Sequence, residues 1–78
     1  MVTPEYVRDL IAQGLACEHL EVQGDGAHFE AVIVSNAFAG KSRVARHQLV
    51  NRTLGARMGN EIHALSMKTL TPEEWKTA

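Results

Sequence analysis

The stretch "HLEVQGDGAHFEAVIVS", residues 19–35, decides the fold, because two apolar runs flank a glycine-containing turn. In the first run Leu20 and Val22 alternate with polar residues, which is typical of a strand with one solvated face. The letters "GDG" supply turn residues that tolerate a positive φ angle. The second run, residues 28–35, is the more apolar. The stretch therefore predicts a β-hairpin whose second strand lies centrally in a small sheet.

Helical patterns lie on both sides of this hairpin. Thr3 can cap a helix that starts with proline at its first position and glutamate near the positive end of its dipole. Apolar residues at helical spacing then predict a helix over about residues 4–16. After the hairpin, Ser42 is a suitable N-cap, and the apolar positions that follow predict a second helix over about residues 43–54.

A third strand is predicted near the C-terminus. Residues 61–70, "EIHALSMKTL", alternate again, which puts His63, Leu65 and Met67 on one face and Ile62 on the other. The Thr-x-x-Glu sequence that follows has the form of a capping box, and it begins a terminal turn that folds Trp75 onto the body.

The order of elements is α-β-β-α-(α)-β, with a break and a short further helical turn at "GARMGN", residues 55–60. We expect a two-layer α+β domain spanning residues 1–78, with helices on one face of a three-stranded sheet. Seventy-eight residues allow one core, since so short a chain cannot divide its burial between two.

Composition places the chain among ordinary globular proteins, with 45% apolar and 22% charged residues. Its longest nearly apolar run, residues 31–34, is far shorter than the roughly 20 residues that span a bilayer, and no secretion signal is recognised. We therefore expect a cytoplasmic protein without membrane segments. The single cysteine, Cys17, excludes an internal disulfide.

The net charge of −1 hides an uneven distribution of charge. Residues 1–30 carry six acids and one base, whereas residues 31–57 carry five bases and no acid. Such a segment suits phosphates or an acidic partner, although basic residues on a solvated helix are also common. The five bases are Lys41, Arg43, Arg46, Arg52 and Arg57.

Patterns of nucleotide binding and of nucleophilic catalysis are not met. "GDGAHF" matches neither glycine-rich phosphate motif, and "AGKSR" lacks the upstream glycine of a P-loop. Cys17 follows a helix whose negative end disfavours a thiolate. The serines and histidines form no recognised triad pattern. We expect a protein that is not an enzyme.

The four histidines have different settings. His19 is predicted on the solvated face of the first strand, and His47 at the border of the core, where it and Arg46 can offer charge or hydrogen bonds to a partner. His28 and His63 begin strands, where a side chain can project past the sheet. Both a structural role and a metal role are open for them. Two imidazoles supply only part of a coordination shell, so a metal role requires ligands from outside.

The segments "RVARHQLVNRTLG" and "EIHALSMKTLTPEEW" resemble the BolA-like family, and the resemblance spans essentially the whole chain. It implies a class II KH-like arrangement, α-β-β-α-α-β, which agrees with the order found from periodicity. The residues that match the family pattern are Val34, Ser35, Phe38, Gly40, Arg46, His47, Val50, Ile62, His63, Ala64, Leu65, Thr71, Pro72 and Trp75.

The resemblance implies a shared cofactor. BolA-like proteins pair with monothiol glutaredoxins and share a [2Fe-2S] cluster, to which the glutaredoxin and bound glutathione each contribute a cysteine. The family positions for the remaining ligands are His28 and His63. The short "GDGAHF" loop looks like the short-loop branch rather than the stress-associated founding member. The implied role is an adaptor in cluster trafficking or iron sensing, and alone we expect a monomer or weak homodimer.

Alternatives stay open beside this one. DNA binding is ascribed to some BolA-like proteins, and the basic central region could neutralise phosphates there. A KH-like module kept for an unrelated protein contact is a third possibility. Gly55 and Gly59 have the wrong spacing for KH-style RNA binding, and Asn51 stands where relatives often have tyrosine. The residues predicted to contact a partner or nucleic acid are Lys41, Arg43, Arg46, His47 and Arg52.

Overall fold

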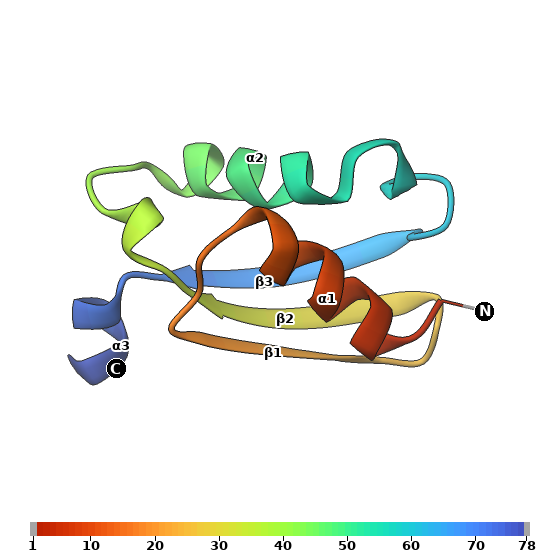
Figure 1. Cartoon of the computed structure of the whole chain (residues 1–78), viewed down its shortest axis with the longest axis horizontal. Coiled ribbons are helices and arrows are strands. Elements are labelled where there is room, and N and C mark those ends of the chain that lie inside the picture. The colour runs from red at the N-terminus through yellow and green to blue at the C-terminus, as the bar shows by residue number, and fades with distance from the viewer. Residues whose placement is uncertain (1, 78) are drawn as a thin grey trace.

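The hairpin predicted from residues 19–35 is present and forms most of a three-stranded sheet. Our computed structural model of the chain describes residues 2–77. The central strand, β2, pairs antiparallel with β1 and parallel with β3, so the sheet order is β1-β2-β3 (Figure 1). The strands are β1 (His19–Gly24), β2 (His28–Val34) and β3 (Ala64–Leu70).

The two long helices pack against one face of this sheet, which confirms the predicted two-layer α+β fold (Figure 1). Thr3 and Ser42 cap them as predicted, because each side-chain oxygen accepts a backbone N–H, at 3.1 and 3.2 Å. The helices are α1 (Pro4–Gly14), α2 (Arg43–Leu54) and the short α3 (Pro72–Thr77), with 3₁₀ turns η1 (Asn36–Phe38) and η2 (Gly55–Arg57). None of the described helices has the length and apolar character needed to cross a membrane.

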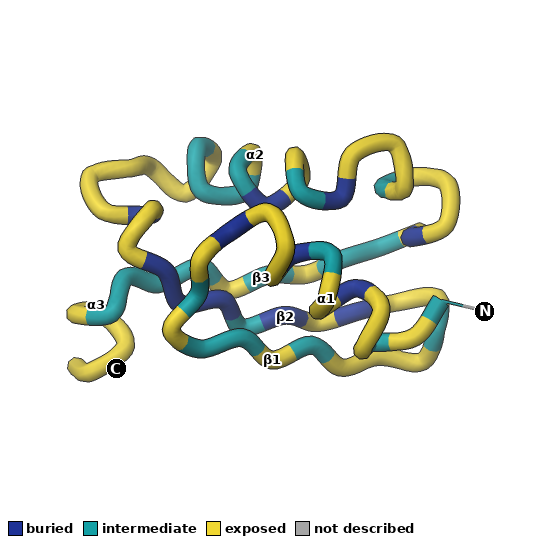
Figure 2. The backbone as a smooth tube through the Cα atoms, viewed as in Figure 1, coloured by how far each residue is buried: buried dark blue, intermediate teal, exposed yellow. Residues whose placement is uncertain are grey.

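The core lies between the helices and the sheet (Figure 2). Phe29, Ala31 and Ile33 of β2 point toward the helices, and the side chains of the alternate positions point to the other face. Burying each large apolar side chain contributes about 2 kcal/mol. The helical and loop residues that meet these β2 side chains are Val7, Ile11, Leu15, Phe38, Val50, Leu54 and Ile62.

The third strand differs from its prediction. It begins at Ala64, not at residue 61, and the alternation does not extend back to Ile62. The prediction that Ile62 lies on the face opposite Leu65 and Met67 is wrong, because Ile62 is fully buried in the core that those two residues also border. A turn causes this: the N–H of Ile62 donates to the carbonyl of Arg57 at 3.0 Å, which turns the side chain inward.

Two further features differ from the sequence prediction. α1 ends at Gly14, two residues before its predicted end, because Leu15 already has an extended backbone with φ −150°. The connection after β2 contains η1, which the sequence did not predict. Buried Ser35 holds it, since its hydroxyl donates to the Ala16 carbonyl at 2.7 Å and accepts the N–H of Ala37 at 3.1 Å.

Candidate functional site

The turn between β1 and β2 fixes the backbone of His28. The carboxylate of Asp25 accepts the backbone N–H groups of Ala27 and His28, each at 2.9 Å. The bond from the His28 N–H lowers the pKa of Asp25 most, and the bond from Ala27 lowers it further. Gly26 has φ 101°, a conformation that favours glycine. The turn therefore holds the first residue of β2 by its backbone, while the imidazole of His28 stays exposed.

His63 is positioned by the turn that precedes β3. Ile62 anchors this turn in the core, and its carbonyl accepts the N–H of Gly59 at 2.8 Å. The next residue, His63, is exposed. It lines a hollow of ≈ 490 Å³ whose other walls are Val2, Tyr6, Gly26 and Glu61.

The sheet register brings the two histidine positions together. His28 is the partner of Ala64, so His63 is next to it on the neighbouring chain segment. Strand spacing and rise place the two Cα atoms about 6 Å apart. His28 does not line the hollow that His63 lines. The structure thus puts both histidines at the same end of the sheet, and their role as ligands stays a prediction.

This end of the sheet offers two imidazoles and little else to a metal. Residues 2–77 contain no group of three or more His, Cys, Asp or Glu side chains arranged to hold a metal ion. Neutral imidazole nitrogens are good ligands for iron, zinc and copper. A metal centre held by His28 and His63 would therefore take its other ligands from a second molecule.

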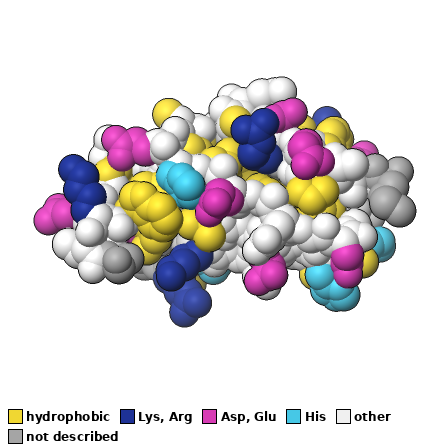
Figure 3. Space-filling model, turned by 90° about the horizontal axis from the view of Figure 1, so that it is seen from below, with side chains coloured by type: hydrophobic (Ala, Val, Ile, Leu, Met, Phe, Trp, Pro, Cys, Tyr) yellow, Lys and Arg dark blue, Asp and Glu magenta, His cyan; other side chains and the backbone are white. Residues whose placement is uncertain are grey.

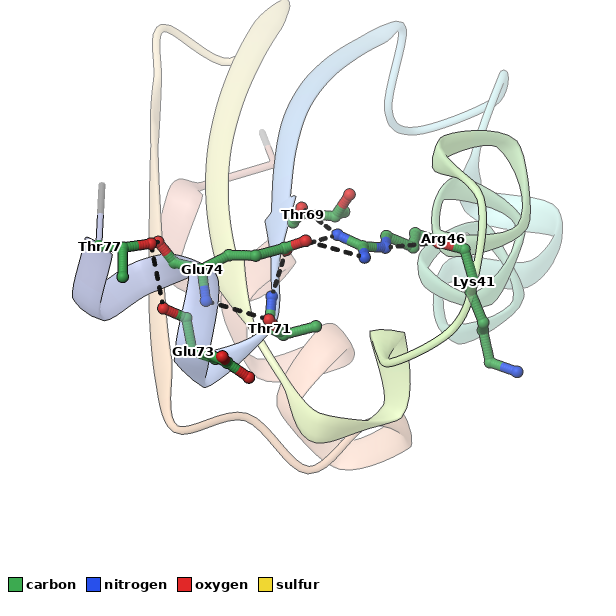
Figure 4. A network of polar contacts seen from close by, with 7 residues as sticks. All are labelled: Lys41, Arg46, Thr69, Thr71, Glu73, Glu74 and Thr77. Atoms are coloured by element: carbon green, nitrogen blue, oxygen red, sulfur yellow. Dashed lines mark hydrogen bonds and ion pairs between the residues drawn. The ribbon is translucent and has the colours of Figure 1, made fainter.

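At the other end of β3, the side chain of Arg46 forms hydrogen bonds with other residues of the chain (Figure 4). Its guanidinium donates to the Thr69 carbonyl at 3.1 Å and to both carboxylate oxygens of Glu74, at 2.8 and 3.3 Å. It also donates to the Lys41 carbonyl at 3.0 Å and lies 5.9 Å from the ring centroid of Phe38. Arg46 therefore connects α2 to both β3 and α3, whatever outside contact it also makes.

The same contacts hold the C-terminal helix. The ion pair with Arg46, followed by the backbone N–H of Thr71, lowers the pKa of Glu74 to about 2. Glu74 accepts the N–H of Thr71 at 2.8 Å, and its own N–H donates to the Thr71 hydroxyl at 3.1 Å. This is the predicted capping box. The sequence indicated the cap, but it contained no signal for the long-range pairing of Glu74 with Arg46.

The other residues predicted to contact a partner divide between two surfaces. Lys41, Arg43 and His47 line a hollow of ≈ 660 Å³ beside β3, whereas Arg52 lies apart, next to Gln48 and Asn51. His47 borders the core as predicted, and its Nε2 atom is buried without a hydrogen-bond partner in the described part of the chain. The basic residue of this lining that the sequence did not single out is Lys68.

The face of the sheet away from the helices carries mixed charges, hydrophobic side chains and histidines (Figure 3). His19 lies on this face as predicted, but its side chain is partly covered. Its ring stacks on that of Trp75, with centroids 4.7 Å apart, and the side chain is 35% exposed. Its Nε2 atom lies 3.0 Å from a carboxylate oxygen of Glu21. Trp75 therefore folds onto the body as predicted, and it covers His19 there.

The chain is similar to known proteins over most of its length. A family model described as "BolA-like protein" matches residues 11–74. The DNA-binding transcriptional regulator BolA of Vibrio cholerae is 47% identical over 58 residues, which cover 74% of this chain but 55% of the regulator. BolA-like protein 2 of Mus musculus is 38% identical, over 95% of this chain and 91% of that protein.

A solved structure shows the same architecture. The structure of a bolA protein homologue from Coxiella burnetii superimposes with a TM-score of 0.88 at 43% sequence identity. The match covers 97% of this chain and 99% of that one. Fold and sequence thus agree on the same group of proteins.

Proposed function

Because the chain belongs to the BolA-like protein family, we propose that it is a cytoplasmic, non-enzymatic adaptor that binds a monothiol glutaredoxin. In the complex it co-ligates a [2Fe-2S] cluster, with glutathione and the glutaredoxin cysteine as the other ligands. Its role is to pass clusters on or to sense iron. The observation that carries the proposal is the placement of His28 and His63 on neighbouring segments at one end of the sheet.

The local chemistry supports this role. Both side chains are exposed, so a partner can bring a cluster to them without unfolding the turn. Imidazole must be neutral to bind iron, so cluster binding weakens as the pH falls. Two histidine ligands raise a cluster's reduction potential above that of all-cysteine ligation. The bonds that Asp25 makes hold the backbone of His28 and leave its imidazole free.

The test is a reconstitution of the complex. The chain, a monothiol glutaredoxin and glutathione are mixed with a [2Fe-2S] cluster, and visible absorption and cluster retention are followed. We expect His28→Ala and His63→Ala each to change the spectrum and speed cluster loss. His19→Ala is the matched control, because His19 lies on the first strand, against Trp75. An unchanged spectrum and retention with His63→Ala would falsify the ligand assignment.

DNA binding is the second candidate function. The Vibrio cholerae relative is named a DNA-binding transcriptional regulator, and Lys41, Arg43 and Arg52 are exposed on and beside α2. Such binding should weaken steeply with salt, and removing Arg43 or Arg52 should lower the salt slope by about 1 each. Retention on a DNA column at low salt is the measurement. A chain that passes unretained would remove this candidate.

A further inference from the structure

The outer edge of β3 has backbone groups that point away from the sheet. The carbonyl of Leu70 accepts the N–H of Ser35 at 2.9 Å, so Leu70 faces β2. Backbone direction alternates along a strand, which turns Thr69 and Met67 outward. The bond from Arg46 to the Thr69 carbonyl agrees with this. Within residues 2–77, no hydrogen bond reaches the backbone of Met67 from that side.

A groove follows this edge. It is the hollow of ≈ 660 Å³ already described, with residues 67–70 of β3 as one wall and the start of α2 as the other. An open strand edge with a groove beside it is suited to pairing with an added strand. Arg46 occupies the Thr69 carbonyl, so the open part of the edge is at Met67 and at the N–H of Thr69.

The charges around the groove indicate which kind of chain could add to β3. Lys41, Arg43 and Lys68 line it, and none of the three forms an ion pair with another described residue. The acid in the lining, Glu74, is already paired with Arg46. The groove therefore has a surplus of positive charge, which complements a chain rich in Asp and Glu.

We propose that this groove binds an extended acidic segment of a partner protein, which adds to β3 as a fourth strand. Its backbone pairs with Met67, and its carboxylates lie near Lys41, Arg43 and Lys68. A peptide fits better than a phosphate backbone here, because a phosphate only accepts hydrogen bonds and leaves the outward carbonyl of Met67 without a donor.

This site is separate from the proposed cluster site. Met67 and Thr69 lie toward the far end of β3 from His63, and the strand's rise puts Thr69 about 20 Å from that histidine. The chain can therefore hold an acidic partner segment and a cluster partner at the same time. If a variant loses cluster binding, binding of the acidic segment can still be measured, and the reverse also holds.

The first test uses NMR of the isotopically labelled chain with a short synthetic peptide of alternating glutamate and valine. We expect the amides of Met67 and Thr69 to shift, and exchange of the Met67 amide with solvent to slow roughly tenfold at saturation. Two further peptides carry backbone N-methyl groups on alternate residues, one set on odd positions and one on even. One set should lose affinity roughly tenfold and the other should bind as before, because one side of an added strand pairs with β3.

Equal binding by both methylated peptides would show ionic attachment without strand pairing and would overturn the proposal. Failure of the unmethylated peptide to bind at millimolar concentration, or stronger shifts at Met67 with a short DNA duplex, would also overturn it.

The second test asks whether charge in the groove matters. Arg43→Glu should weaken the peptide roughly tenfold. Arg52→Glu is the matched control, because it reverses the same charge on the same helix outside the groove. A control peptide with lysine in place of glutamate should not bind. Equal weakening by both variants would point to general attraction and contradict a defined groove.

Discussion

The two ends of β3 use polar side chains in opposite ways. At the C-terminal end, Arg46 and Glu74 bond to each other and to the backbone of Thr69, Thr71 and Lys41. At the N-terminal end, the turns beside the histidines are held by backbone groups and by the side chains of Asp25 and Asn60. The imidazoles of His28 and His63 take part in no hydrogen bond or ion pair within the described residues.

This difference separates residues that build the fold from residues left free to act on something else. A side chain whose donors are all directed at the protein contributes to stability, and its removal should be felt in unfolding. A side chain held in place only through its own backbone adds little to stability, so its chemistry is open to a partner. The predictions that follow test this division, beginning with the change of largest expected effect.

The stability of the hairpin beside His28 should depend on how closely its backbone packs. A Cβ added at Gly24 would lie 2.3 Å from the His28 carbonyl oxygen and 2.7 Å from the ring of Phe29. We expect Gly24→Ala to lower the free energy of unfolding by about 3 kcal/mol, because the hairpin backbone must shift. Urea denaturation measures this change.

Gly40→Ala is the control for this prediction. Gly40 has φ +72° with open space around it, so the left-handed backbone alone should lower stability by about 1 kcal/mol. Equal losses in the two variants would mean that the close approach at Gly24 is not what constrains this end of the sheet.

At the C-terminal end of β3, the stability of the fold should depend on side-chain contacts. Arg46→Ala removes the two bonds to the Lys41 and Thr69 carbonyls and the packing on Phe38, which together stabilise the fold by about 2 kcal/mol. Arg46→Lys should recover part of this, since a lysine cannot keep the bidentate pair with Glu74.

Arg52→Ala on the same helix should change the unfolding free energy by less than about 0.5 kcal/mol, because no described contact depends on that guanidinium. Thermal and urea unfolding of the three variants check the order. If Arg46→Ala were as stable as Arg52→Ala, Arg46 would have no structural role, and its predicted contact with a partner would be its main function.

How far the sequence predicts this molecule depends on the range of each interaction. The hairpin, the helix caps and the capping box at Thr71 were predicted correctly, because each is decided within a few neighbouring residues. The inward position of Ile62 and the cover over His19 were not. Ile62 is turned inward by a bond to Arg57, and His19 is covered by Trp75 from the far end of the chain.

The candidate site shows the same limit. Thr69 and Glu74, two partners of Arg46, lie 23 and 28 positions along the chain, so no local pattern indicates them. Periodicity put His28 and His63 at the starts of two strands, but their proximity depends on the parallel pairing of β2 with β3. The ligand role came from the family resemblance, since two exposed histidines have no spacing that distinguishes ligands from surface residues.

The histidines should separate stability from function. We expect His28→Ala and His63→Ala to change the free energy of unfolding by less than about 0.5 kcal/mol, because both side chains are exposed and neither holds a described contact. Urea unfolding of the apo chain measures this, alongside cluster retention in the glutaredoxin complex. A large loss of stability in either variant would place that histidine with the residues that build the fold.

The acid titration of Glu74 should change stability only at low pH. Its pKa is lowered from 4.5 to about 2 in the folded chain, so the pairing with Arg46 stabilises the fold fully above pH 4.5 and is lost as the pH falls toward 2. The wild-type chain should therefore lose stability across this window with a steeper slope than Glu74→Gln. Above pH 5 the difference between the two proteins should be constant.

Urea midpoints at pH values on both sides of 4.5, followed by the fluorescence of the chain's single tryptophan, measure both slopes. Trp75 is suited to this, because it lies on α3 next to Glu74 and stacks on His19. Asp25 titrates in the same direction but is present in both proteins, so the difference between them isolates Glu74. Parallel slopes would show that α3 is held without the carboxylate, and the contrast between the two ends of β3 would then rest on Arg46 and its carbonyl partners.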